Sequence, residues 1–180
     1  MGEVLPVYFE QYSVEDWESW NDPWELIQGF PYCMSPAPSF SHQSINTQIL
    51  VELATQLKFC GKCKAVMPID WQIDEQTVVQ PDILVLCRPV TGKRLFQVPV
   101  CLFEILSPST IKKDQTVKYE LYQNQCVKYY VMVNPDTKLT QAFTLGNENK
   151  YSPMPTSSKL VFDFEGCKVE LDMGQIWASI

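Results

Sequence analysis

Apolar residues recur at every fourth position along residues 39–59, which is the spacing of one face of an α-helix. The positions of this stripe are Ile45, Ile49, Leu53 and Leu57. Ser39 or Ser41 stands where a helix N-cap is expected. The pattern therefore predicts a long helix that buries one face.

Runs of apolar and β-branched residues predict the strands. Three runs follow the long helix, at 64–73, 78–87 and 100–107, and a polar helix at 110–125 leads to a fully apolar strand at 127–135. Shorter elements are expected on either side, namely a helix at 13–20 capped by Ser13, two strands about a turn within 23–35, strands at 139–145, 160–164 and 168–171, and a helix at 172–180 capped by Asp172. This order predicts a mixed β-sheet flanked by helices, and therefore an α/β (α+β) fold.

The length of 180 residues favours a single domain, 1–180. We divide it into an N-terminal extension at 1–23, a core at about 24–145, and C-terminal strands and a helix at 146–180. The apolar runs are far shorter than the roughly 20 residues that cross a bilayer, and the N-terminus lacks the basic and apolar regions of a secretory signal. We therefore expect a cytoplasmic protein without a membrane partner.

The seven cysteines are odd in number and spread along the chain, which favours reduced, buried thiols over a disulfide framework. Cys60 and Cys63 in the segment CGKC have a spacing that is also found in zinc and redox sites. No second pair of ligands follows at a similar spacing. We therefore interpret the segment as a turn that ends the helix at Gly61.

The net charge of −7 argues against non-specific binding to nucleic acid. The charges are, however, unevenly distributed. Residues 1–57 contain eight acidic and no basic residues, whereas residues 58–128 contain ten of the fourteen basic residues and seven acidic ones. The middle of the chain is therefore its only basic part, which weakens the objection from net charge without removing it.

Two acidic residues, Asp82 and Glu104, interrupt neighbouring apolar strands. Burying an ionised carboxylate without a partner costs on the order of several kcal/mol, so each needs a cation or a hydrogen-bond donor. Taken singly, each is more often a structural acid in the core. Strands this close in the chain can also place both carboxylates on one sheet face, where a hard cation such as Mg²⁺ suits them. Pro81 removes a ladder donor, which predicts that Asp82 lies near the start of its strand.

The residue that shares a strand face with Glu104 is Leu106, which cannot supply a cation. Lys118 on the following helix can do so, since Asp114 and Tyr122 lie one turn away on the same face. A solvent-exposed ion pair with Asp114 is the alternative for Lys118. Lys112 and Lys113 come just before Asp114 in the sequence. They are either candidates for phosphate contacts or part of a solvated loop.

Three further residues are weaker candidates. His42, the only histidine, shares the inward stripe of the long helix and is either a site residue or a capping or core residue. Glu25 and Glu52 are acids that either complete a metal shell or lie on the surface.

Five segments in this order, 24–50, 78–86, 103–110, 112–122 and 127–135, resemble the Uma-type family of restriction endonucleases in the PD-(D/E)XK nuclease superfamily. The resemblance implies a restriction-endonuclease-like core, with one helix before and one after the catalytic strands. It also implies hydrolysis of nucleic-acid phosphodiesters with Mg²⁺ (or Mn²⁺), with DNA as the expected substrate and a homodimer as the expected assembly.

Carried over by position, Asp82 matches the aspartate of the "PD" motif and Glu104 the second metal ligand. Leu106 replaces the usual lysine, and Lys118 matches the helix lysine proposed as its substitute in the family. Glu25 matches the early "YELI" glutamate and His42 the histidine of the first helix. Among the departures, Phe30 replaces the acid of the family's "DGE" turn.

The leading hypothesis is therefore a metal-dependent endonuclease in which Asp82 and Glu104 bind the metal and Lys118 assists the attack of water. The main alternative is a non-catalytic module that binds nucleic acid or protein and retains the nuclease fold. The overall acidity and the absence of a dedicated DNA-binding motif favour that alternative. A purely structural pair of acids is a third possibility.

Overall fold

The computed structural model describes residues 10–34, 38–155 and 159–180. Of the predicted N-terminal extension, residues 1–9 lie outside this described part. The extension contains helix α1 (Val14–Glu18), which is capped as expected. Ser13 Oγ accepts a hydrogen bond from the Asp16 amide, and the Asp16 carboxylate accepts one from the Ser13 amide.

A small antiparallel sheet has the strand order β2 (Phe30–Cys33), β1 (Trp24–Ile27), β5 (Thr77–Val79), β4 (Trp71–Asp74). The predicted turn between its first two strands is confirmed, with Gln28 and Gly29 both at positive φ. Pro31 lies within β2, where it is tolerated because β2 is an edge strand.

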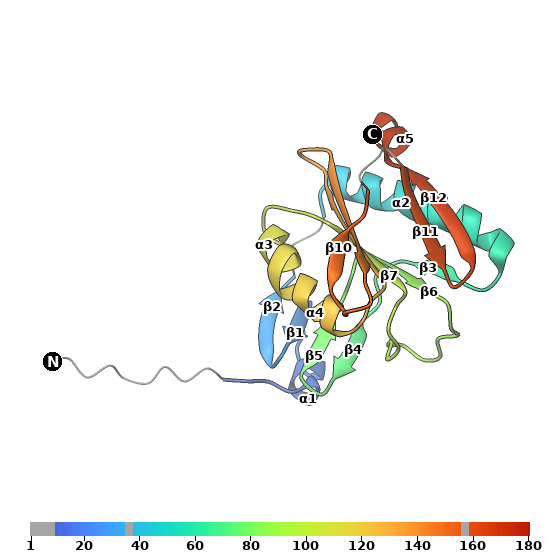
Figure 1. The fold of residues 1–180 in the computed structure, drawn as a ribbon. Helices are drawn as coiled ribbons and strands as arrows, with labels where there is room; N and C mark the ends of the chain where they lie inside the picture. The colour runs from blue at the N-terminus through green and yellow to red at the C-terminus, as the bar shows by residue number, and fades with distance from the viewer. Residues whose placement is uncertain (1–9, 35–37, 156–158) are drawn as a thin grey trace.

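The larger sheet has six strands in the order β10 (Tyr151–Pro153), β9 (Leu139–Leu145), β8 (Tyr129–Asn134), β7 (Cys101–Ile105), β6 (Ile83–Leu86), β3 (Lys64–Val66). Among its paired strands, β7 and β8 run parallel and the others antiparallel. The predicted mixed sheet flanked by helices is therefore confirmed (Figure 1).

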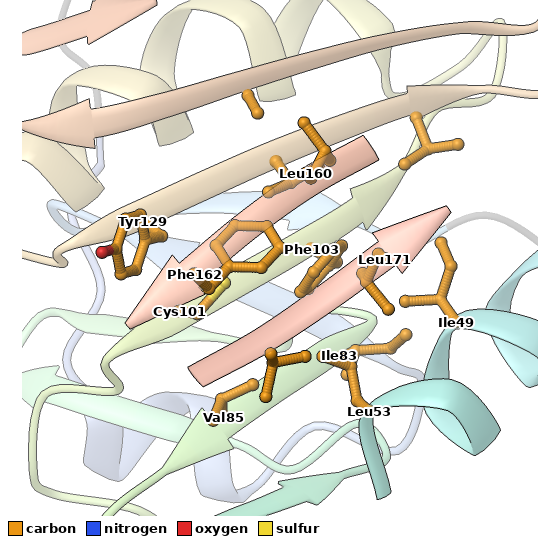
Figure 2. Packing of buried hydrophobic residues seen from close by; sticks show 14 of the residues in the cluster. Ile49, Leu53, Ile83, Val85, Cys101, Phe103, Tyr129, Leu160, Phe162 and Leu171 are labelled. Atoms are coloured by element: carbon orange, nitrogen blue, oxygen red, sulfur yellow. The ribbon is translucent and has the colours of Figure 1, made fainter. Parts of the chain in front are cut away.

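The predicted long helix is α2 (Phe40–Cys60), capped by Ser39 and ended by Gly61 in the left-handed conformation. Its apolar stripe packs against one face of the larger sheet, together with the hairpin β11 (Lys159–Phe164) and β12 (Cys167–Asp172) and helix α5 (Met173–Ala178). Figure 2 shows Ile49 and Leu53 of α2 beside Leu171 of the hairpin and Phe103 and Ile83 of the sheet. This face forms the main core.

The opposite face of the sheet carries the predicted polar helix. The structure divides that helix into α3 (Ile111–Lys113), a π-helical turn η1 (Asp114–Lys118) and α4 (Tyr119–Asn124). A second core lies here, where Tyr122 of α4 packs with Trp71 and Tyr130. The π-helical turn was not predicted from the sequence.

Two predicted strands are each divided in two. The run 64–73 gives β3 and β4, and the run 78–87 gives β5 and β6, because the chain passes from one sheet to the other within each run. Residues 80–82, which include Pro81, make the second passage. The expectation that Asp82 lies at a strand start is therefore confirmed, while strand β10 was not predicted.

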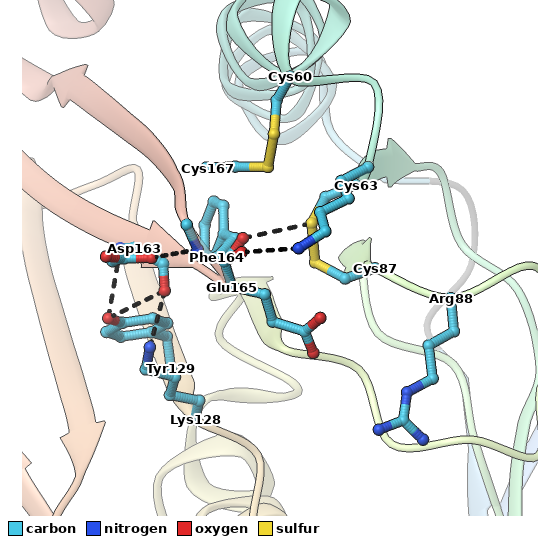
Figure 3. Close-up of a disulfide and its surroundings, with 12 residues drawn as sticks. Cys60, Cys63, Cys87, Arg88, Lys128, Tyr129, Asp163, Phe164, Glu165 and Cys167 are labelled. Carbon is cyan, nitrogen blue, oxygen red and sulfur yellow. Dashed lines mark hydrogen bonds between the residues drawn. A yellow bond between two sulfur atoms is a disulfide. The ribbon is translucent and has the colours of Figure 1, made fainter.

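The prediction of reduced thiols is wrong for four cysteines. Disulfides join Cys60 to Cys167 and Cys63 to Cys87 at the C-terminal end of α2 (Figure 3). The first spans 107 residues of sequence, so local spacing could not reveal it. Cys101 is a buried free thiol as expected, and Cys33 and Cys126 are exposed free thiols. The helix-ending turn at Gly61 is confirmed.

Within the described ranges, no helix combines the length and the apolar character that a membrane span requires.

Candidate functional site

A pocket of about 440 Å³ opens where β7 ends and β6 begins. Its lining includes seven of the nine predicted site residues, which come from both sheets, from α2 and from the helix that follows β7: Glu25, His42, Asp82, Glu104, Lys113, Asp114 and Lys118. The two others lie outside the lining. Tyr122 is buried directly behind the pocket, and Lys112 is exposed.

Strand register brings Asp82 and Glu104 together. Ile83 pairs with Phe103 in the antiparallel ladder of β6 and β7, so one further step places Asp82 opposite Glu104. The Glu104 side chain belongs to the face opposite α2, since its neighbours Phe103 and Ile105 pack in the main core. Asp82 Oδ2 accepts a hydrogen bond of 2.7 Å from the Ile105 amide, which fixes this carboxylate at the strand end.

Glu104 is buried, with 4% of its surface exposed. Its Oε1 accepts hydrogen bonds from Lys118 Nζ at 2.9 Å and from the Tyr122 hydroxyl at 2.8 Å. Burial raises the pKa of the Glu104 carboxyl well above its ordinary value, although the Lys118 ammonium acts in the opposite direction. Lys118 and Tyr122 are therefore the partners that a buried acid on this strand requires.

Lys118 is also buried and lies among three carboxylates. Its Nζ is 2.7 Å from Glu25 Oε1 and 3.8 Å from Asp114 Oδ1, in addition to its bond with Glu104. Burial alone would lower the pKa of Lys118, but the three negative charges outweigh it and raise this pKa well above its ordinary value. Lys118 is consequently held as an ammonium ion.

Glu25 is the second carboxylate that holds this lysine. Its Oε2 pairs with Lys113, and its Oε1 also accepts a hydrogen bond of 2.9 Å from the Gln80 amide. Burial raises the pKa of Glu25, but Lys118 and Lys113 together lower it below its ordinary value. Glu25 therefore has a central place in the cluster, which its sequence context only weakly indicated.

The π-helical turn explains how one helix supplies both cations. Lys113 and Lys118 are five residues apart, a separation that places side chains about 140° apart around a regular α-helix. In a π-turn the hydrogen bonds join residues i and i+5, so two residues that are five positions apart lie closer to the same side of the helix. Both lysines thus reach the single carboxylate of Glu25. Thr116, whose hydroxyl donates to the Lys112 carbonyl at 2.6 Å, is the local signal for a disturbed helix.

His42 of α2 contacts the other acid of the site. Its Nε2 is 3.4 Å from Asp82 Oδ2, while its Nδ1 is buried without a hydrogen-bond partner in the described part of the chain. The structure thus places His42 at the site. Glu52, the other acid considered on this helix, is exposed and does not line the pocket.

The sequence did not predict Gln80, or the hydroxyl residues after β7, as residues of the pocket. Gln80 was not predicted, although it stands beside Pro81 and Asp82, and it binds Glu25 through its backbone amide. The hydroxyls of Ser107, Ser109 and Thr110 also line the pocket. Ser107 Oγ lies 2.9 Å from Ser109 Oγ and 3.1 Å from Thr110 Oγ1. The segment SPST after the strand was the available signal.

The charges of the pocket suit one divalent cation. Five carboxylates line it, from Glu25, Asp82, Glu104, Asp114 and Asp136, against the two ammonium groups of Lys113 and Lys118, which leaves a formal charge of 2 − 5 = −3 when all are ionised. The described residues contain no group of three or more His, Cys, Asp or Glu side chains placed to hold a metal ion. Mg²⁺ needs only one or two carboxylates together with waters, so this donor set fits it.

The arrangement of contacts also leaves suitable oxygens. Among the described residues, the contacts of Asp82 are made by Oδ2 and those of Glu104 by Oε1. Asp82 Oδ1 and Glu104 Oε2 are therefore the oxygens left for a ligand.

A mixed sheet flanked by helices, with two carboxylates at neighbouring strand ends, defines a protein with a restriction-endonuclease-like core. The chain belongs to the Uma2 family, described as "Putative restriction endonuclease", whose model matches residues 9–178. No curated protein matches the sequence. The chain is similar in structure to "a putative nuclease belonging to DUF820 from Anabaena variabilis", with a TM-score of 0.76 and 14% identity over 92% of this chain and 97% of that one. At this identity the likeness shows a shared fold.

Proposed function

We propose that the protein is a metal-dependent endonuclease that hydrolyses phosphodiester bonds of DNA. The observation that carries this proposal is the convergence of Asp82, Glu104 and the buried ammonium of Lys118 on one pocket. Membership of a family described as restriction endonucleases supports an enzyme that acts on nucleic acid. The pocket supports the finer assignment of roles.

Asp82 and Glu104 would hold Mg²⁺ or Mn²⁺ through the oxygens that face away from their protein partners. A divalent ion bound there supplies Lewis-acid stabilisation of a phosphoryl oxygen and a nucleophile at neutral pH. The Ile105 amide and His42 position Asp82, and Tyr122 positions Glu104.

Lys118 acts as a fixed positive charge in this proposal. Because its pKa is raised by the surrounding carboxylates, it does not accept the proton of the attacking water. Its ammonium instead stabilises negative charge that develops on the phosphoryl group and orients the water for attack. Glu25 and Asp114 hold that ammonium in place.

Phosphate contacts were predicted for Lys112 and Lys113. Lys113 lines the pocket, but its ammonium is paired with Glu25. It therefore offsets the negative charge of Glu25 and is less available for a phosphate. Lys112 is exposed outside the pocket lining and is the better placed of the two for a flanking phosphate.

We further propose a homodimer, because two symmetric sites cut two strands most simply. Light scattering tests this, and a monomeric mass at micromolar concentration would contradict it. A cytoplasmic location remains a prediction from the sequence. The two disulfides argue against it, since such bonds are usual in oxidising compartments.

Nicking of supercoiled plasmid with Mg²⁺ or Mn²⁺ tests the proposed activity. We expect cleavage by the wild type, none with EDTA, and none by Asp82→Ala or Glu104→Gln. Glu52→Gln provides a matched control, because Glu52 is an exposed acid outside the pocket. Cleavage that persists in Asp82→Ala at the wild-type rate would refute the site.

The alternative, a binding module without turnover, is favoured by one observation. Glu104 already accepts hydrogen bonds from the Lys118 ammonium and the Tyr122 hydroxyl, so the fold does not require a metal to satisfy it. Calorimetry separates the two functions. The endonuclease predicts binding of Mn²⁺ that Asp82→Asn weakens at least tenfold, whereas a module predicts no metal binding at millimolar concentration.

A further inference from the structure

A second cavity, of about 550 Å³, adjoins the proposed catalytic pocket. Three tryptophans from α1, the following turn and β1 line it, namely Trp17, Trp20 and Trp24. The two cavities share Met34 and Gln80 as lining residues. A ligand that extends beyond the catalytic pocket at this border enters a tryptophan-lined space.

Strand β1 separates the two cavities. Successive side chains of a strand point to opposite faces, so Glu25 faces the catalytic pocket and Trp24 the tryptophan cavity. Gln80 links them, since its amide donates to Glu25 Oε1 while its side chain donates to Asp70 Oδ1 at 2.9 Å. The tryptophan cavity is thus rigidly tied to the residues that hold Lys118.

Trp20 is the aromatic residue best placed to stack on a ligand. Tyr12 and Trp24 hold it through edge-type contacts at ring distances of 5.4 and 6.1 Å. In the part of the chain that the structure describes, no ring stacks parallel to Trp20. By contrast, Trp17 is committed, because its Nε1 donates to the Trp24 carbonyl at 2.6 Å and Arg94 lies over its ring at 4.9 Å.

The polar groups of the cavity are mixed and pre-positioned. Arg94 is held by Glu18 at 2.8 Å and by Gln72 Oε1 at 2.9 Å. Its lining also offers the carboxylates of Asp22 and Asp70 as acceptors. With three carboxylates against one guanidinium, the formal charge is 1 − 3 = −2, which repels a phosphate but not a neutral heterocycle.

We propose that the tryptophan cavity binds an unpaired nucleobase of the substrate, while the adjoining phosphate occupies the catalytic pocket. Base–aromatic stacking on Trp20 supplies affinity, and the donors and acceptors around it contact the base edge. This inference rests on the proposed function and narrows it, because a base held in a duplex cannot enter the cavity. The substrate class is therefore nucleic acid with unpaired bases at the cleavage site.

An aromatic site with acids can also bind an organic ammonium ion. The structure favours the base, since the protein's own Arg94 already lies over the ring of Trp17. A base also uses the amide and guanidinium donors, which an ammonium ion cannot.

Binding measured by fluorescence anisotropy with Ca²⁺ in place of Mg²⁺ tests the inference without requiring cleavage, because Ca²⁺ is also bound by carboxylate oxygens and offsets the negative charge of the catalytic pocket. Three labelled 15-mers are compared on the wild-type chain: a single strand, the same strand with abasic residues, and its duplex. We expect the intact single strand to bind about tenfold more tightly than either of the others. Equal affinity for all three, or no binding of the single strand, would overturn the inference.

Two substitutions of one residue then locate the base. Trp20→Leu keeps an apolar side chain but removes the stacking face, and Trp20→Phe keeps an aromatic ring. We expect Trp20→Leu to lose about tenfold in affinity for the intact strand and nothing for the abasic one, with Trp20→Phe close to wild type. Phe59→Leu, an 88% exposed aromatic on α2, is the matched control and should have no effect.

The outcomes separate the two proposals. If the wild type with Mg²⁺ or Mn²⁺ cleaves neither the plasmid nor the single strand but keeps Trp20-dependent binding of the single strand, the base site is supported and the endonuclease is refuted. Asp82-dependent cleavage with Trp20→Leu at wild-type affinity refutes the base site alone. Competition by tetramethylammonium at equal potency against intact and abasic strands would assign the cavity to a cation instead.

Discussion

Glu25 of the four-stranded sheet and Glu104 of the six-stranded sheet share the ammonium of Lys118, at 2.7 and 2.9 Å. Lys118 therefore links two sheets that share no strand. The candidate site lies at this junction. Its charged groups contribute to the arrangement of the fold as well as to the proposed chemistry.

Replacing Lys118 with methionine should destabilise the protein strongly. The change leaves Glu25 and Glu104 buried without their common cation, and breaking a buried ion pair costs roughly 3–5 kcal/mol. Urea unfolding of Lys118→Met and of the neighbouring Lys112→Met measures the difference. Lys112 is exposed, so its variant should stay within about 0.5 kcal/mol of wild type. Equal stability of the two variants would contradict the buried pairing.

Glu25→Gln should make stability less dependent on pH in the acid range. The folded-state pKa of Glu25 is lowered from an ordinary 4.5, so its ionised form stabilises the fold above that value and the contribution is lost as pH falls through the lowered pKa. We expect the variant to be less stable at pH 7, with the gap closing below pH 4.5. Thermal unfolding between pH 3 and 7 tests this, and a constant gap would contradict it.

Tyr122→Phe should weaken metal binding and cleavage. The substitution keeps the ring that stacks on Trp71 and removes the 2.8 Å hydrogen bond to Glu104. Hydrogen bonds to charged groups contribute about 1.5–3 kcal/mol. We expect weaker Mn²⁺ binding by calorimetry and a cleavage rate at least tenfold lower. Tyr119→Phe on the same helix is the control and should match wild type in both.

Reduction of the disulfides should lower stability. A cross-link that closes a loop of about 100 residues is worth roughly 2–5 kcal/mol, and Cys60–Cys167 spans 107 residues. Cys60→Ser should reproduce most of the effect of dithiothreitol on the melting temperature. Cys126→Ser, at an exposed free thiol, should have none. Mass spectrometry after alkylation without reductant, if it finds seven modified cysteines, would contradict the pairing.

The sequence predicted elements whose signal is local. The stripe from Ile45 to Leu57 and the apolar strand at 127–135 needed only the periodicity of their own residues. The positions of Asp82, Glu104 and Lys118 could also be anticipated, because a charge in an apolar strand requires a partner.

Features that depend on distant segments could not be predicted in this way. The division of 78–87 between two sheets depends on which strands pair with β5 and β6, and the partner of Cys60 lies on the last hairpin. The π-helical turn gives Lys113 and Lys118 a common partner in Glu25, which lies 88 residues before Lys113 in the chain. Neither residue spacing nor composition encodes such contacts.

The parallel pairing of β7 with β8 has a consequence for how such a site can evolve. Parallel neighbours require a crossover connection, so the chain must pass over the sheet between Ile105 and Tyr129. That crossing carries its helix above the face on which Glu104 stands, whatever the sequence of the helix. A lysine therefore needs no place on the strand itself, because the connectivity of the fold brings a second backbone within its reach.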